Sequence, residues 1–151
     1  MIDRFERFSF AISEISKHWH KLAADEMEKY GLKGPHSVYL LTLLRCPEGL
    51  SAPQLCEKCG KDKSDVSRMM AIMEKHGLVV KEGVHQNRYN GVFKLTPEGE
   101  RAASHVRERA SLAVELAGGE LSEEDRSIFY SSLETIAKNL RNLSRDGLPE
   151  Q

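Results

Sequence analysis

Apolar residues recur at helical spacing over the first 30 positions of the chain. They alternate in steps of three and four, which predicts a helix with one apolar side that packs along another helix. These residues are Phe5, Phe8, Ile12, Ile15, Trp19 and Leu22. Gly31, Gly34 and Pro35 interrupt the pattern, and a denser apolar segment over 38–44 then predicts a short buried helix that ends before Pro47.

The middle of the chain predicts two short helices followed by a hairpin. Ser51 begins the first of them and Gly60 ends it, while Asp62 begins the second and Gly77 ends it. Two apolar segments, 78–80 and 92–95, predict strands around a polar loop. Helix, tight turn, helix and hairpin is the order of a winged helix-turn-helix, in which one helix enters the DNA major groove.

Two further helices are predicted after the hairpin, with Thr96 and Ser122 as their N-caps. The last one carries apolar residues at steps of four and three, namely Phe129, Leu133, Ile136, Leu140 and Leu143. Apolar stripes at both ends of the chain are more surface than one small module buries, so we expect a homodimer built from the two ends.

The predicted fold class is mainly α with a small β-hairpin wing. We expect a winged helix-turn-helix DNA-binding domain at 35–98 and a long connecting helix at 97–118. The helices at 1–34 and 119–151 are expected to form a dimerisation layer.

Charge changes this picture only through its distribution. The 151 residues carry 22 bases and 23 acids, a formal net charge of −1. Positions 58–94 hold eight bases and four acids, whereas 97–151 hold seven bases and eleven acids. A basic segment between acidic flanks favours a phosphate-facing module over a general polycation, although a solvated loop would also be charged.

Several function classes are disfavoured by what the sequence contains. No apolar run approaches the roughly 20 residues needed to span a membrane, and no leader opens the chain, so we expect a cytoplasmic protein without a membrane partner. The sequence offers no phosphate-binding glycine loop and no recognisable Ser/His/Asp set, so we expect neither an enzyme nor a cofactor.

With these elements in place, the chain resembles the MarR family of transcriptional regulators (multiple-antibiotic-resistance regulators). The resemblance rests on the order and spacing of residues between positions 50 and 99. They are Leu55, Gly60, Val66-Ser67-Arg68, Gly77-Leu78-Val79, Arg88 and Leu95-Thr96-Pro97-Glu98-Gly99. It implies a homodimer that binds double-stranded DNA at a pseudo-palindromic operator, most often as a repressor. It also implies release when a small molecule, oxidant or metal binds.

The resemblance also implies a DNA-contacting surface on the second of the middle helices, which begins at Asp62, and on the loop of the hairpin. The residues so placed are Lys61, Lys63, Ser64, Asp65, Ser67, Arg68 and Arg88. Alternatively, Ser64 and Asp65 merely complete the helix cap. The family's wing pattern is Asp-Arg-Arg, and here it reads Asn87-Arg88-Tyr89, so the carboxylate that would brace the wing is missing.

Three cysteines offer a second chemistry. Cys56 and Cys59 have the spacing of redox and zinc motifs, but they fall on packing positions of the third helix, and no second such pair supplies the other zinc ligands. We therefore expect core packing and no metal site. A redox or metal sensor, or a thiol oxidoreductase, using Cys46, Cys56 or Cys59 remains an alternative. A winged-helix module that binds another protein is a further one.

A small-molecule effector is expected near the first two helices, since in the family these border the cavity between the two layers. The candidate ligand-binding residues are His18, Trp19, His36 and Tyr39. Here His18 or His20 with His36 could hold an anion, or a metal together with His105. The alternative is that Trp19 belongs to the core and the histidines are solvated or capping.

Overall fold

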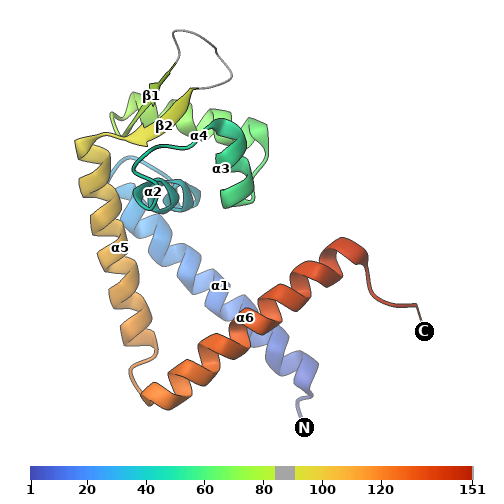
Figure 1. Ribbon diagram of the computed structural model, residues 1–151. Coiled ribbons are helices and arrows are strands. Elements are labelled where there is room, and N and C mark those ends of the chain that lie inside the picture. Colours follow the sequence, from blue (N-terminus) through green and yellow to red (C-terminus); the bar gives the residue numbers. More distant parts are fainter. Residues whose placement is uncertain (84–90, 151) are drawn as a thin grey trace. The chain divides into compact units, whose positions relative to one another are not determined.

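The computed structural model describes residues 1–83 and 91–150. Figure 1 shows a chain made mostly of helices, with one two-stranded antiparallel hairpin. In order, the elements are α1 (Arg4–Glu28), η1 (Gly34–His36), α2 (Ser37–Leu44), α3 (Ala52–Cys59), α4 (Lys63–Lys75), β1 (Val79–Glu82), β2 (Val92–Leu95), α5 (Pro97–Ala117) and α6 (Glu123–Asp146). The predicted fold class, mainly α with a hairpin, is confirmed.

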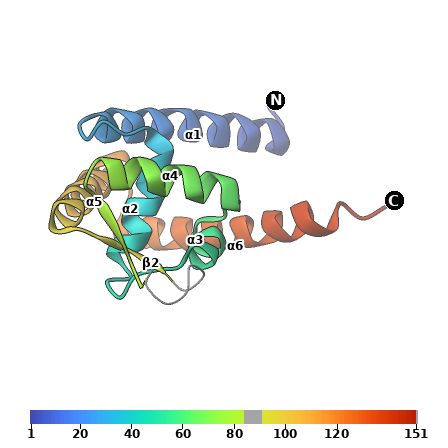
Figure 2. The same ribbon diagram turned by 90° about the horizontal axis from the view of Figure 1, so that it is seen from above.

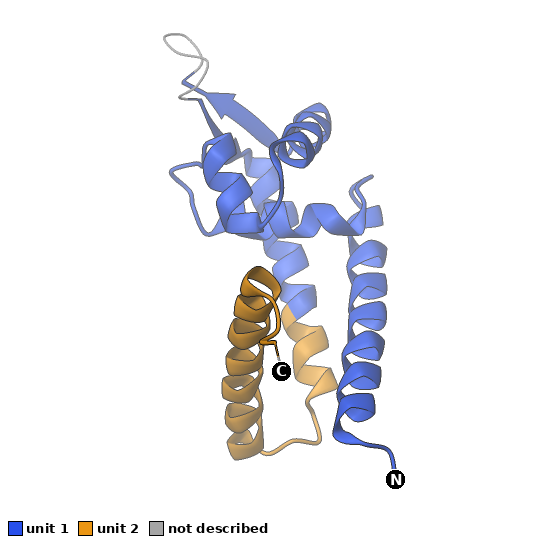
Figure 3. Cartoon of the chain, turned by 90° about the vertical axis from the view of Figure 1, so that its right-hand side faces the viewer, with its two compact units in different colours: residues 1–110 blue, residues 111–151 orange. Residues whose placement is uncertain are grey.

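The chain divides into two compact units, Met1–Ala110 and Ser111–Gln151, shown in different colours in Figure 3. The boundary falls inside α5. The first unit contains α1 to α4, the hairpin and the first part of α5, and the second contains the rest of α5 and all of α6.

The helix starts predicted from single residues are confirmed. The side chains of Ser51, Asp62 and Ser122 each accept a hydrogen bond from the backbone amide three residues on, as N-caps do. Strand β1 begins one residue later than predicted, because the amide of Leu78 donates to the carbonyl of Met73 and so closes the end of α4. The strand then continues to Glu82, which pairs with Val92.

The core of the first unit is formed by buried residues from α1 to α5 and from both strands, among them Leu40 of α2, Met70 of α4 and Phe93 of β2. Figure 2 shows these elements from above. Helix α2 is apolar on nearly all sides, and it buries Tyr39, Leu40 and Leu43. Leu50 and Phe93 exchange two backbone hydrogen bonds of 3.0 and 2.8 Å, so the segment before α3 is attached to β2. These contacts hold the segment before α3 against the hairpin and the core.

The second unit is an αα-hairpin with a clamp at its turn. Arg126 of α6 donates to the carbonyl of Gly118 at 2.8 Å and to the carboxylate of Glu115 at 2.6 Å, and so satisfies acceptors at the end of α5. Across residues 1–83 and 91–150, no helix combines the length and the apolar character needed to cross a membrane.

Candidate nucleic-acid interface

The turn between α3 and α4 is closed by backbone hydrogen bonds. Gly60 ends α3 with a φ of +65°, a left-handed conformation that favours glycine. The amide of Lys61 donates to the carbonyl of Cys56 at 3.1 Å. The carboxylate of Asp62 then accepts a hydrogen bond from the amide of Asp65 at 2.7 Å. Asp62 is thus the N-cap of α4, whose first residue is Lys63. Lys61 is left exposed at this turn.

One side of α4 is anchored in the core and the other faces outward. Val66, Met70 and Met73 are buried. Four of the residues predicted to contact DNA lie exposed on the N-terminal half of the same helix, namely Lys63, Ser64, Ser67 and Arg68. A helix held on one side, with short polar and cationic side chains on the other, has the chemistry to read base edges and bind phosphates. Contact by these particular residues stays a prediction.

Asp65 differs from its neighbours because its carboxylate is already engaged within the protein. It accepts a hydrogen bond of 2.5 Å from the Tyr39 hydroxyl and one of 3.0 Å from Arg68 Nη2. The structure thus joins a predicted DNA-contacting residue to a predicted ligand-binding residue. The only signal in the sequence is a tyrosine inside an apolar helix, whose hydroxyl needs a partner when buried.

The hydrogen bond between Tyr39 and Asp65 is charge-assisted at neutral pH. Burial, followed by the Asp65 carboxylate, raises the pKa of Tyr39 well above its usual value. The bond from Tyr39, with a smaller contribution from Arg68, lowers the pKa of Asp65. Tyr39 is therefore a protonated donor and Asp65 an ionised acceptor, a pairing stronger than a neutral hydrogen bond.

Two lysines of the basic segment already have partners within the hairpin strands. Lys94 Nζ lies 2.9 Å from the Glu82 carboxylate, and Lys81 Nζ lies 5.3 Å from the centroid of the Phe93 ring. Arg88, with Asn87 and Tyr89, lies outside the described residues, so a wing contact by Arg88 stays a prediction.

The four predicted ligand-binding residues divide into two pairs. His18 and Trp19 lie on α1, where both are exposed, so the alternative that places Trp19 in the core is not borne out within this chain. His36, the last residue of η1, and Tyr39 of α2 are both buried. The Nδ1 atom of His36 lies 2.9 Å from the backbone nitrogen of Lys33, and its buried Nε2 atom has no hydrogen-bond partner among the described residues. Burial lowers the pKa of His36.

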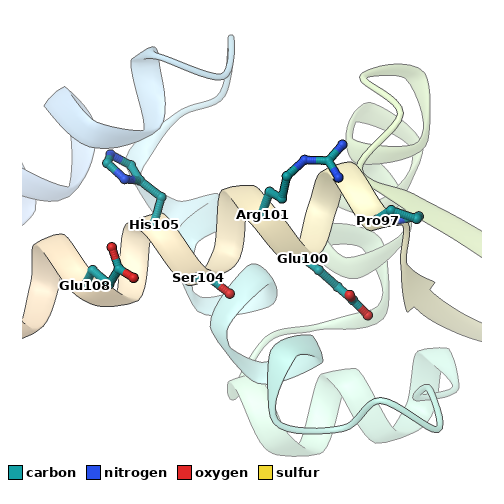
Figure 4. A pocket seen from close by; sticks show the side chains of 6 residues that line it. All are labelled: Pro97, Glu100, Arg101, Ser104, His105 and Glu108. Atoms are coloured by element: carbon teal, nitrogen blue, oxygen red, sulfur yellow. The ribbon is translucent and has the colours of Figure 1, made fainter.

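A shallow hollow of about 420 Å³ runs along the start of α5 (Figure 4). Six exposed residues of this single helix line it, namely Pro97, Glu100, Arg101, Ser104, His105 and Glu108. The predicted ligand-binding residues are not among them. A hollow lined by exposed side chains of one helix does not enclose a ligand as buried pockets do.

The three cysteines are free and half-buried, and all pack against the hydrophobic core. The Sγ of Cys59 lies 3.6 Å from the hydroxyl oxygen of Thr42, and burial raises the pKa of its thiol. These surroundings favour packing over nucleophilic chemistry at Cys59. Within the described ranges, no group of three or more His, Cys, Asp or Glu side chains is arranged to hold a metal ion.

Comparison with known proteins finds a family match over the segment that contains α3 and α4. Residues 30–87 match the sequence model of the MarR family. The MarR resemblance predicted from the motifs is thereby confirmed over the segment that contains α2, α3, α4 and β1. No curated protein matches the chain significantly in sequence.

Solved structures share the fold over nearly the whole chain. A MarR-family transcriptional regulator from Listeria monocytogenes, solved with a 26mer DNA, is 18% identical with a TM-score of 0.78, covering 100% of this chain and 99% of that one. A MarR regulator from Methanosarcina mazei is 21% identical with a TM-score of 0.79, covering 91% and 99%. A MarR protein from Peptoclostridium difficile is 16% identical with a TM-score of 0.80, covering 94% of each chain.

Proposed function

We propose that this protein is a MarR-type transcriptional regulator that binds double-stranded DNA as a homodimer and acts as a repressor at a pseudo-palindromic operator. The observation that carries the proposal is the exposed N-terminal half of α4, where cationic and hydroxyl side chains stand on a helix anchored by Val66, Met70 and Met73. The match of fold to a regulator solved with DNA supports the same assignment. The proposal assigns no reaction to the chain.

Selection of bound duplexes from a random DNA pool tests the proposal directly. We expect enrichment of a palindrome whose half-sites lie about one helical turn apart, because two copies of α4 must enter successive major grooves. Without enrichment of any duplex, DNA recognition is contradicted and a protein-binding role for the winged helix is favoured. Expression from a promoter that contains the enriched site then tests repression, which requires lower expression when the protein is present.

A pair of substitutions on the same helix assigns the contact surface. Arg68→Ala should weaken binding to the enriched site by about 1–3 kcal/mol, if Arg68 contacts a base edge. Lys75→Ala is the matched control, since Lys75 is an exposed cation at the other end of α4. Equal losses for both variants would point to general electrostatic attraction instead of a recognition surface.

The homodimer is supported by the exposed apolar sides of α1 and α6. In the single chain Phe5 is 73% exposed, Ile15 57% and Leu140 48%, along stripes that keep helical spacing. Apolar side chains gathered on one side of a helix mark an interface. Sedimentation velocity should show a dimer, and Leu140→Glu should shift it toward monomer, whereas Lys138→Glu on the same helix should not.

Effector binding is proposed at the exposed pair His18 and Trp19 on α1, and the buried His36 and Tyr39 are the residues proposed to respond. Trp19 is the only tryptophan, so its fluorescence reports binding directly. A small organic anion that changes this fluorescence should also release DNA, and His18→Ala should weaken both effects. A fluorescence change without loss of DNA binding would contradict a regulatory site there. A cytoplasmic location is part of the same proposal.

A further inference from the structure

A buried tyrosine of α2 donates a hydrogen bond to a charged residue of α4, the helix proposed to contact DNA. Tyr39 has no exposed surface, and its hydroxyl donates to Oδ2 of Asp65 at 2.5 Å. The two residues come from α2 and α4 and are 26 positions apart in the sequence. The bond therefore ties the first turn of α4 to the core of the first unit.

The other oxygen of the same carboxylate holds an arginine. Oδ1 of Asp65 accepts from Nη2 of Arg68 at 3.0 Å, while the Arg68 side chain remains 63% exposed. Each carboxylate oxygen has a separate partner, so rotation of the carboxylate would break one bond or the other. Tyr39 thus constrains the plane of the Asp65 carboxylate, and the carboxylate constrains one end of the guanidinium.

This arrangement leaves most of the guanidinium available. Arginine has five N–H donors, of which the bond to Asp65 uses one. The remaining donors lie on an exposed side chain near the start of α4, and a guanidinium edge pairs with the O6 and N7 acceptors of guanine. An arginine already held in one orientation loses less rotamer freedom on binding than a free one.

Asp65 also changes the electrostatics of this surface. Its carboxylate offsets part of the Arg68 charge, and so lowers the attraction for any phosphate irrespective of sequence. Orientation and partial neutralisation act in the same direction, because both favour a directed contact with a base over a general contact with the backbone.

We propose that Tyr39 is a specificity-determining residue, which acts through Asp65 to orient Arg68 for the reading of one base. The inference rests on the proposed DNA-binding function and extends it, since it gives a residue buried in α2 a role in base discrimination. Tyr39 touches no DNA in this arrangement and is a positioning residue.

The test measures discrimination instead of affinity alone. Arg68→Ala first identifies the operator position at which the variant no longer prefers one base pair. The affinity for the enriched operator is then compared with the affinity for duplexes that carry another base pair at that position. Tyr39→Phe should reduce the affinity ratio between the two duplexes by about 3- to 10-fold, the scale of a weakened charge-assisted contact. The salt dependence of binding should stay unchanged, because no phosphate contact is lost. Tyr30→Phe is the matched control, as Tyr30 is half-buried and lies in the turn that follows α1.

The double variant Tyr39→Phe with Arg68→Ala separates a positioning role from a structural one. If Tyr39 acts through Arg68, loss of the Tyr39 hydroxyl should not change discrimination any further in a protein that already carries Arg68→Ala. A loss that persists there, or discrimination unchanged by Tyr39→Phe, overturns the inference while DNA binding by the unaltered protein stands. Absence of any sequence preference in the unaltered protein would contradict the proposed function instead.

A second variant keeps the test open if Tyr39→Phe does not fold, which circular dichroism would reveal. Asp65→Asn removes the charge at almost constant shape. It should raise affinity for unrelated DNA and lower discrimination, and the loss of discrimination should vanish in the Arg68→Ala background. If that loss survives without Arg68, Asp65 itself reads the base and the proposed chain of contacts is wrong.

Discussion

The hydroxyl of Thr96 donates a 2.6 Å hydrogen bond to the carbonyl of Gly77, and so joins the start of α5 to the turn that ends α4. The same hydroxyl accepts from the amide of Gly99 at 3.0 Å, as an N-cap does. The amide of Thr96 donates to the carbonyl of Leu78, also at 3.0 Å. One residue therefore satisfies groups at the end of α4 and at the beginning of α5, the long helix that follows the hairpin.

Thr96→Val should lower the free energy of unfolding by about 1–3 kcal/mol, because it removes both the helix cap and the bond to Gly77 at nearly constant volume. Thr96→Ser keeps the hydroxyl and should lose less than half as much. Urea denaturation of the two variants measures the difference. Equal stability of the valine and serine variants would show that the hydroxyl contributes nothing.

Gly99 allows α5 to approach Leu78 more closely than any other residue could. A Cβ atom at this position would lie 1.9 Å from the carbonyl oxygen of Leu78. Gly99→Ala should therefore cost at least about 2 kcal/mol, since backbone must shift to relieve the overlap. Gly118→Ala is the control, because a Cβ there meets its nearest atom at 3.5 Å. Thermal unfolding of both variants checks the prediction, and similar midpoints would refute the close approach.

His36 should make the protein less stable as the pH falls below 6.5. Burial lowers its pKa below the ordinary value of 6.5, so the unfolded chain takes up a proton that the folded chain resists. The stabilisation is complete above pH 6.5 and is lost below it, with a slope of at most about 1.4 kcal/mol per pH unit. Asp65 contributes only at lower pH, because its pKa lies below 3.8.

The pH dependence is measured by urea denaturation at pH 7.5, 6.5 and 5.5. His36→Asn, whose amide oxygen can replace the Nδ1 acceptor, should flatten the slope, while His18→Asn on exposed α1 should leave it as it is. If the free energy of unfolding of His36→Asn still falls as steeply between pH 6.5 and 5.5, groups other than His36 cause the pH dependence.

Cys59 should react slowly with thiol reagents in the folded protein. It is half-buried, and burial raises its pKa, so little thiolate is present at neutral pH. Mass spectrometry after alkylation, in buffer and in denaturant, gives the rate for each cysteine. Rapid modification of Cys59 in buffer would favour the redox alternative over core packing.

Much of the fold follows from local signals in the sequence. Ser51, Asp62, Thr96 and Ser122 each begin a helix because their side chains bond amides in the same turn, so neighbouring residues carry the information. The spacing of apolar residues identifies α1 and α6, because helical periodicity is likewise carried by residues close together in the sequence. Leu78 closes the end of α4 and does not begin β1, because its amide bonds to the carbonyl of Met73, a contact that the apolar pattern of the sequence does not reveal.

The site was less predictable because its contacts join distant segments. Asp65 reads from the sequence as a capping or DNA-contacting residue, and Tyr39 as part of a ligand site, but their hydrogen bond depends on how α2 packs against α4. His36 shows the same limit, since its burial follows from the packing of η1 and α2 and not from its neighbours in the chain.

The exposed apolar side of α1 has a consequence for how much protein a cell must hold. A chain that leaves Phe5, Ile15 and Leu22 at least half exposed gains stability when a copy covers them. If the proposed homodimer forms, its stability and its occupancy of DNA both rise with protein concentration, so dilution during growth lowers both. Its abundance becomes a control parameter in its own right, acting alongside any effector.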